Sequence, residues 1–181
     1  ATGNLKRVSL ELGGKNPFIV FPDADLERVV QAAAHSAFFL QGQNCQCASR
    51  LLVHEDVLER VVAGIAAVAR SLPVGHGLDP ATRIGPLVSA GQLDRVQDYV
   101  ASGRQEGAEL VTGGARLAGP GYFMEPAVFA GTRPDMRIVR EEIFGPVTCV
   151  QGFSGADLAA IAHQANDSEF GLVASVWTRD L

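Results

Sequence analysis

The stretch PFIVFPDADLERVVQAAAHSAF, residues 17–38, decides the fold. Its first part, residues 17–21, is a continuous apolar run, which is typical of a strand buried on both faces. Asp25 can then cap a helix whose apolar residues recur at spacings of three and four: Leu26, Val29, Val30, Ala33, Ala34, Ala37 and Phe38. A buried strand is therefore followed at once by an amphipathic helix.

The same alternation of strands and helices continues along the chain. Ser89 can cap a helix, and the proline in YFMEPAVFA places that strand at an edge or next to a bulge. Strands are predicted at residues 7–12, 17–21, 50–55, 108–114, 122–130, 146–153 and 172–178, and helices at 25–42, 57–72, 89–103 or 89–107, and 157–165. This order predicts an α/β fold with a mostly parallel sheet flanked by helices.

Composition excludes several classes of protein. The 181 residues are 47% apolar and 19% charged, which excludes intrinsic disorder and suits one domain with a substantial core. The net charge of −5 argues against nucleic acid as a partner. No apolar run is long enough to span a membrane, so we expect no membrane partner. The three cysteines indicate reduced thiols, and hence a cytoplasmic location.

Known cofactor and metal motifs are missing from the sequence. Neither a dinucleotide-binding glycine pattern nor a P-loop occurs. The four histidines are scattered, and Cys45 and Cys47 stand one residue too close for the usual zinc-binding pair. We therefore predict no metal site.

The segment FFLQGQNCQCASR, residues 38–50, places Cys45 at a backbone turn after a helix. A thiol at such a turn can accept backbone N–H dipoles, which favour the nucleophilic thiolate. The alternative is an inert buried cysteine. Cys47 and Cys149 fit that alternative, since Cys149 lies in an apolar strand.

Two further segments carry acidic residues. In LELGGKNP, residues 10–17, Glu11 stands within a β-type run, where a carboxylate is costly unless it is paired, solvated or protonated. A carboxyl group with a raised pKa near a thiol could act as a general base, whereas an exposed edge-strand glutamate is the alternative. The third segment, REEIFGPV at residues 140–147, reads by itself as a solvated loop.

Taken together, these segments resemble the aldehyde dehydrogenase superfamily. LELGGKNP, GQNC and EEIFGPV follow one another in the family's order, and the separation of Glu11 and Cys45 also matches. FPDADLE, GPLVSAGQLDRV and ANDSEFGLVASVWTRDL extend the resemblance over essentially the whole chain.

The resemblance implies a three-layer catalytic domain that oxidises a small-molecule aldehyde with NAD or NADP. Cys45 would form a thiohemiacetal and then a thioester, and Glu11 would activate the water that hydrolyses it. Glu142 would bind the nicotinamide ribose, and Phe144 would lie beside the nicotinamide. The remaining implied cofactor-binding residues are Gly13, where the backbone approaches the cofactor, and Gln92 and Arg95, which would make further ribose contacts. Arg95 departs from a frequent lysine.

The resemblance also implies that the chain is part of a longer enzyme. Residues 1–12 would end a cofactor-binding domain that holds most of NAD or NADP. Residues 13–181 would form the catalytic domain, truncated at its C-terminal end, of a homodimer or homotetramer. Two alternatives for this chain alone remain open, an inactive fragment and a cofactor-independent thiol esterase. The particular aldehyde is not determined by the sequence.

Overall fold

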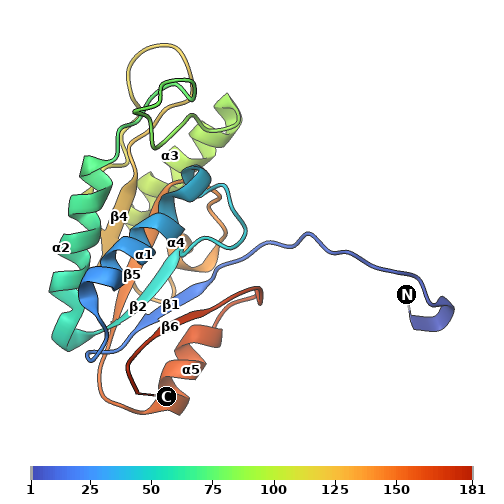
Figure 1. Cartoon of the computed structure of the whole chain (residues 1–181), viewed down its shortest axis with the longest axis vertical. Coiled ribbons are helices and arrows are strands. Elements are labelled where there is room, and N and C mark those ends of the chain that lie inside the picture. The colour runs from blue at the N-terminus through green and yellow to red at the C-terminus, as the bar shows by residue number, and fades with distance from the viewer. Residues whose placement is uncertain (1, 181) are drawn as a thin grey trace.

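A six-stranded sheet forms the middle layer of the computed structural model, which describes residues 2–180 (Figure 1). Its strand order is β3-β4-β5-β2-β1-β6. Neighbouring strands run parallel except β3 and β4, which are antiparallel. The strands are β1 (Pro17–Val20), β2 (Arg50–His54), β3 (Glu109–Thr112), β4 (Ala127–Ala130), β5 (Val147–Phe153) and β6 (Ser175–Trp177).

Helices cover both faces of this sheet. The first face carries α1 and α2, and the second carries α3 and α4 at one end and α5 at the other. Their bounds are α1 (Leu26–Phe38), α2 (Glu55–Ser71), α3 (Ala90–Gln105), α4 (Arg137–Arg140) and α5 (Leu158–Asn166), with short 3-10 turns η1 (Thr2–Asn4) and η2 (Phe39–Gly42). The predicted fold class is therefore confirmed.

Alternation along the strands explains the two faces. In β2, Leu51 and Val53 pack toward α1 and α2, whereas Leu52 packs toward α5. In β5, Val150 belongs to the first face and Cys149 to the second. Successive side chains of a strand point to opposite faces, so a continuous apolar run is needed where both faces are covered.

Three of the four predicted helix starts are confirmed by their caps, whereas α2 begins at Glu55, earlier than predicted. Asp25 accepts a hydrogen bond from the Arg28 N–H, and Ser89 accepts one from the Gln92 N–H. Asp157 caps α5 in the same way. Each side chain satisfies a donor that has no partner inside its helix. The predicted end of the first helix at Gly42 is wrong, because α1 ends at Phe38 and η2 follows.

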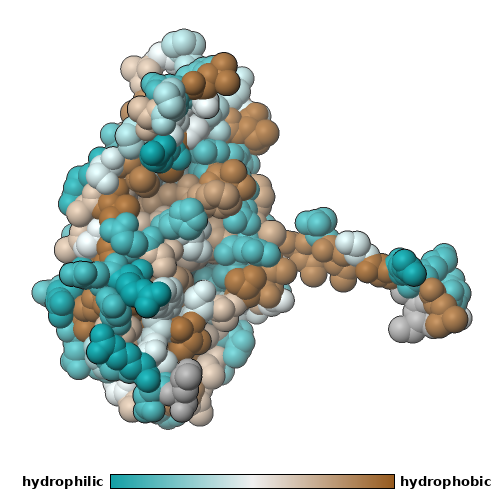
Figure 2. All heavy atoms as spheres, in the orientation of Figure 1, coloured by the Kyte–Doolittle hydropathy of each residue, from teal (hydrophilic) through white to brown (hydrophobic). Residues whose placement is uncertain are grey.

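The strand predicted at residues 7–12 is absent from the structure. This segment is exposed and forms an extended arm that leads away from the sheet (Figure 1). Apolar side chains of the arm lie open to solvent, as Figure 2 shows, among them Val8, Leu10 and Leu12. Period-two alternation produces a strand only where a neighbouring strand supplies hydrogen bonds, and none of the described residues does so here.

The proline-containing strand is shorter than predicted. β4 begins only after Pro126 and is flanked by β3 and β5, so it is not the edge strand of the sheet. The edge strands are β3 and β6, and the β3–β4 register shifts between Leu110 and Thr112. The irregularity expected near Pro126 therefore falls in its neighbour. No helix among residues 2–180 combines the length and apolarity that crossing a bilayer requires.

Candidate active site

The three segments singled out in the sequence meet backbone to backbone. A Cβ on Gly14 would lie 2.2 Å from the Cys45 carbonyl oxygen. A Cβ on Gly42, whose φ is +65°, would lie 2.1 Å from the Gly145 carbonyl oxygen. Only glycine permits such approaches, so these two residues allow segments 10–17, 42–45 and 141–147 to assemble.

An open hollow of about 410 Å³ lies where these segments meet. Five of the seven predicted site residues line it, whereas Gln92 and Arg95 do not. Its lining residues are Glu11, Leu12, Gly13, Gln43, Asn44, Cys45, Glu142 and Phe144. Sequence reasoning could not show this assembly, because the residues lie on three separate segments.

Cys45 is half-buried in the turn that follows η2. Asn44 shapes this turn, because its Oδ1 accepts the Gln46 N–H at 3.0 Å. Among the hydrogen bonds of the described residues, none is donated by the Cys45 N–H. At the edge of the hollow, Cys45 therefore combines a thiol with a backbone N–H that donates no hydrogen bond to the described residues.

Positive φ angles occur at one residue that lines the hollow and at two residues of the neighbouring turn η2. Leu40 and Gln41 have φ of 51° and 59°, and Phe144 has φ of 57°. This left-handed region is unfavourable for side chains as bulky as leucine and phenylalanine. At Phe144 the strained backbone leaves an aromatic side chain 38% exposed at the hollow. Strain of this kind persists where surrounding structure enforces it, often at functional sites.

Glu142 reaches across the hollow to the glycine segment. Its Oε1 accepts the Gly14 N–H at 2.8 Å. Its other oxygen lies on the Gly13 side, where a Cβ on Gly13 would come within 2.8 Å of Oε2. One carboxylate oxygen is therefore engaged by backbone, and this contact ties segment 141–147 to segment 10–17.

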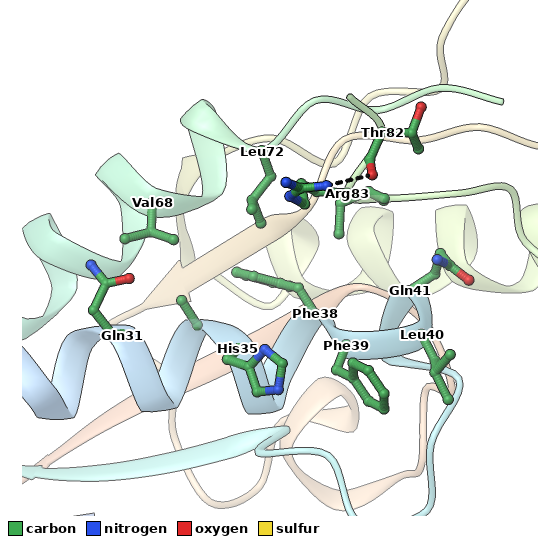
Figure 3. A pocket seen from close by; sticks show the side chains of 12 residues that line it. Gln31, His35, Phe38, Phe39, Leu40, Gln41, Val68, Leu72, Thr82 and Arg83 are labelled. Carbon is green, nitrogen blue, oxygen red and sulfur yellow. Dashed lines mark hydrogen bonds between the residues drawn. The ribbon is translucent and has the colours of Figure 1, made fainter. Parts of the chain in front are cut away.

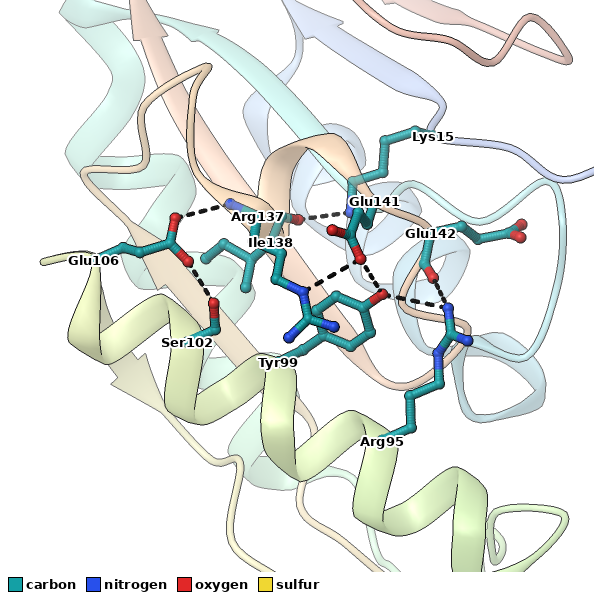
Figure 4. Close-up of polar contacts among 9 residues, drawn as sticks. All are labelled: Lys15, Arg95, Tyr99, Ser102, Glu106, Arg137, Ile138, Glu141 and Glu142. Carbon is teal, nitrogen blue, oxygen red and sulfur yellow. Dashed lines mark hydrogen bonds and ion pairs between the residues drawn. The ribbon is translucent and has the colours of Figure 1, made fainter.

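Gln92 and Arg95 hold the backbone that carries Glu142 and Phe144. Gln92 Nε2 donates to the carbonyls of Phe144 at 2.7 Å and Ile143 at 3.2 Å. An Arg95 guanidinium nitrogen donates to the Glu142 carbonyl at 3.0 Å (Figure 4). In this structure both side chains fix the loop from the side of α3.

Glu11 lies on the arm and is exposed. The prediction that Glu11 lies inside a β-strand is wrong. Among the described residues, no strand buries its carboxylate. The arm nevertheless brings Glu11 to the same hollow as Cys45. This shared hollow is the feature on which a role for the pair depends.

Comparison with known proteins identifies the family. The aldehyde dehydrogenase family model matches residues 1–181. The chain belongs to the aldehyde dehydrogenase family. Betaine aldehyde dehydrogenase of Bacillus subtilis is 44% identical over 100% of this chain, and the mitochondrial aldehyde dehydrogenase of Leishmania tarentolae is 45% identical over 100%.

Solved aldehyde dehydrogenase structures share the fold. The NAD⁺ complex of aldehyde dehydrogenase from Bacillus cereus matches 99% of this chain with a TM-score of 0.92 and 42% identity. NAD-dependent aldehyde dehydrogenase from Sinorhizobium meliloti matches 99% with a TM-score of 0.92 and 44% identity. The chain spans 36% of each of these structures, 37% of the Bacillus subtilis relative and 36% of the Leishmania relative.

Sequence reasoning missed two buried polar residues of this aldehyde dehydrogenase chain, Lys15 and Asn16. Lys15 Nζ donates to the Ile138 carbonyl at 2.7 Å (Figure 4), and burial lowers the pKa of this amine. Asn16 bonds to the carbonyls of Cys45 and Cys47. Their position directly before a strand that is buried on both faces is the sequence feature that could have indicated their burial.

The other two cysteines of this family member are buried. Burial raises the pKa of the Cys149 thiol to about 11 and also raises that of Cys47. Because the thiolate is the nucleophile, both are poor candidates for chemistry. Residues 2–180 contain no group of three side chains suited to a metal ion.

A second hollow, of about 420 Å³, lies beside η2 (Figure 3). Apolar side chains of α1, η2 and α2 line much of it, including Phe38, Phe39 and Val68. It contains none of the seven predicted site residues. The candidate active site is therefore the more polar hollow at Cys45.

Proposed function

We propose that the protein carrying this chain oxidises an aldehyde to a carboxylic acid with NAD or NADP, using Cys45 as nucleophile and Glu11 as general base. The observation that carries the proposal is the meeting of Cys45, Glu11, Glu142, Phe144 and Gly13 in one hollow. Family membership and the relatives named for aldehyde dehydrogenase activity support it.

Cys45 performs the covalent step in this proposal. Its thiolate sulfur attacks the aldehyde carbonyl carbon and gives a thiohemiacetal, whose oxyanion the Cys45 N–H can stabilise. Loss of hydride from that carbon leaves a thioester on Cys45. Glu11 then takes a proton from water, and the resulting hydroxide displaces the Cys45 thiolate and releases the carboxylic acid.

The cofactor supplies the acceptor for the hydride. The residues at the hollow suit its nicotinamide end, because Glu142 offers carboxylate oxygens to ribose hydroxyls and Phe144 offers an exposed ring to a flat heterocycle. Gly13 lines the same hollow, and because it lacks a Cβ its backbone can lie close to Glu142 and to the cofactor. Gln92 and Arg95 support this surface by holding the carbonyls of segment 142–144.

The test is a panel of aldehydes with NAD⁺ and NADP⁺ on the complete gene product. Cys45→Ala should abolish reduction of either cofactor, whereas the matched variant Cys47→Ala should retain it. Unchanged turnover in Cys45→Ala would overturn the proposal.

The role of Glu11 has its own readout. Glu11→Gln should still reduce about one cofactor per active site in the first turnover, and then stall, because the thioester on Cys45 is not hydrolysed. A mass increase on the Cys45 peptide should accompany the stall. Glu27→Gln, on the exposed start of α1, is the matched control and should turn over normally.

In this proposal residues 13–181 form a catalytic domain and residues 1–12 belong to a cofactor-binding domain. The exposed apolar arm supports the second assignment, because such side chains pack well against a further sheet. A cytoplasmic location and a homodimeric or homotetrameric state stay predictions. So does a cofactor-independent thiol esterase activity for the chain alone.

A further inference from the structure

Asn16 is a buried amide that the catalytic steps above leave without a role. Asn16 is 3% exposed and lies directly before β1. Its Nδ2 donates to the Cys45 carbonyl at 2.7 Å and to the Cys47 carbonyl at 3.0 Å. Its Oδ1 accepts the Val173 N–H at 3.2 Å.

These partners use both amide hydrogens and the amide oxygen. Two carbonyl oxygens can be satisfied only by the NH₂ end, and the Val173 N–H only by the oxygen, so the orientation of the amide is fixed. Asn16 thereby joins the turn that carries Cys45 to the backbone at Val173. A buried network with every member satisfied holds its parts rigidly.

These hydrogen bonds of the Asn16 side chain form a clamp, and one of them is made to Cys45, the proposed nucleophile. The Cys45 carbonyl oxygen accepts from Asn16 Nδ2 at 2.7 Å and lies against Gly14, where a Cβ would come within 2.2 Å of it. The Cys45 Cβ and N–H share the Cα that bears this carbonyl carbon. Fixing the carbonyl therefore restricts the directions in which the thiol and the N–H can point.

We propose that Asn16 is a positioning residue for Cys45, which aligns the thiol and the Cys45 N–H for attack on a carbonyl group. This inference rests on the proposed nucleophilic role of Cys45. Positioning of this kind affects carbonyl chemistry strongly, because a misplacement of about 1 Å can lower a rate by about a hundredfold. Simple alkylation of a thiol needs no backbone donor for an oxyanion.

The experiment compares two reactions of Cys45 in the complete gene product. Acylation by p-nitrophenyl acetate develops an oxyanion, whereas alkylation by iodoacetamide does not. The release of p-nitrophenolate in the first turnover, less the release in Cys45→Ala, measures acylation of Cys45, and peptide mass spectrometry measures its alkylation. In Asn16→Ala we expect acylation to slow by between about tenfold and a hundredfold, with alkylation changed much less.

A matched control separates positioning from stability. Gln97→Ala also removes a side-chain amide that donates to a backbone carbonyl, that of Gly114 at 2.9 Å, but away from the hollow. It should lower the unfolding midpoint while leaving the ratio of the two Cys45 rates unchanged. Asn16→Ser, which can keep one donor, should give an intermediate ratio and serves if Asn16→Ala does not fold.

The outcomes distinguish the two proposals. Equal acylation-to-alkylation ratios in the wild-type chain and in the folded Asn16 variants would overturn the positioning role while leaving Cys45 as the nucleophile. A complete wild-type protein whose release of p-nitrophenolate does not depend on Cys45 would overturn both proposals.

Discussion

At the scale of single residues, the three thiols differ in their surroundings. Cys45 lines an open hollow, whereas Cys149 and Cys47 are buried with raised pKa values, that of Cys149 at about 11. The Cys149 thiol also donates to the Ile138 carbonyl at 3.3 Å. Burial thus suppresses the thiolate in two of the three cysteines.

We expect iodoacetamide to modify Cys45 first at mildly alkaline pH, with Cys47 and Cys149 protected until the chain unfolds. Peptide mass spectrometry at a series of times checks this order. In concentrated urea all three should react at similar rates, which serves as the control. Labelling of Cys149 as fast as Cys45 in the folded chain would contradict the prediction.

The close backbone packing at Gly14 can be tested by a single substitution. Gly14→Ala should lower the free energy of unfolding by about 1–3 kcal/mol, because its Cβ would clash with the Cys45 carbonyl, which is backbone. Gly91→Ala is the matched control in the first turn of α3, where a Cβ meets nothing within 4 Å. It should be neutral or raise stability by up to about 1 kcal/mol. Urea unfolding measures both, and equal effects would argue against the steric explanation.

At the scale of elements, contacts between α3 and α4 fix the loop that carries Glu142. The Tyr99 hydroxyl donates to Glu141 Oε2 at 2.7 Å, and Arg137 Nε lies 3.2 Å from the same oxygen (Figure 4). The Arg137 guanidinium also lies over the Tyr99 ring, 4.2 Å from its centroid. This polar cluster and the bonds from Gln92 and Arg95 hold one loop from one helix.

The contacts of Glu141 in this cluster should make the stability of the folded chain depend on pH. The Tyr99 hydroxyl, followed by Arg137, lowers the pKa of the Glu141 carboxyl from its ordinary value of 4.5. Because the pKa of Glu141 is lower in the folded state than in the unfolded state, the ionised carboxylate stabilises the folded state above pH 4.5. This contribution is lost as the pH falls through the folded-state pKa of Glu141.

Glu141→Gln should therefore lower the thermal unfolding midpoint at neutral pH, and the difference from the wild type should shrink as the pH falls below 4.5. Because the Glu141 side chain is half-exposed, we expect a small effect. Glu109→Gln, at an exposed position of β3, is the control and should show a smaller difference at neutral pH. A difference independent of pH would contradict the assignment.

At the scale of the whole molecule, the arm and the folded body are distinct parts. Residues 5–12 are exposed and contribute no strand to the sheet, whereas the three core clusters lie within residues 18–165. Stability should therefore reside in the body. The hollow at Cys45 is the place where the arm, through Glu11, and the body meet.

Limited trypsin digestion tests this division. Cleavage should occur first after Lys6 or Arg7, which are exposed on the arm, and it should leave Glu11 attached to the body. The thermal unfolding midpoint of the product should match that of the intact chain. A drop of several degrees would show that the arm supports the fold, and first cleavage within the sheet would contradict the division into arm and body.

The sequence by itself determined the α/β fold and most of its elements. Apolar runs such as Phe18–Val20 and the caps Asp25 and Ser89 act locally, so their pattern predicts strands and helix starts without knowledge of the rest. The motifs around Cys45 and Glu142 also indicated the family. Local signals failed at residues 7–12, where a strand requires partners that no local pattern can supply.

Only the tertiary structure decided how the site is assembled. The approach of Gly14 to the Cys45 carbonyl, the reach of Glu142 to Gly14 and the clamp of Asn16 all join residues far apart in the chain. The seating of Gln92 and Arg95 against backbone carbonyls has the same origin. Such contacts depend on the packing of whole elements, and a spacing of residues along the chain does not encode the distances between them.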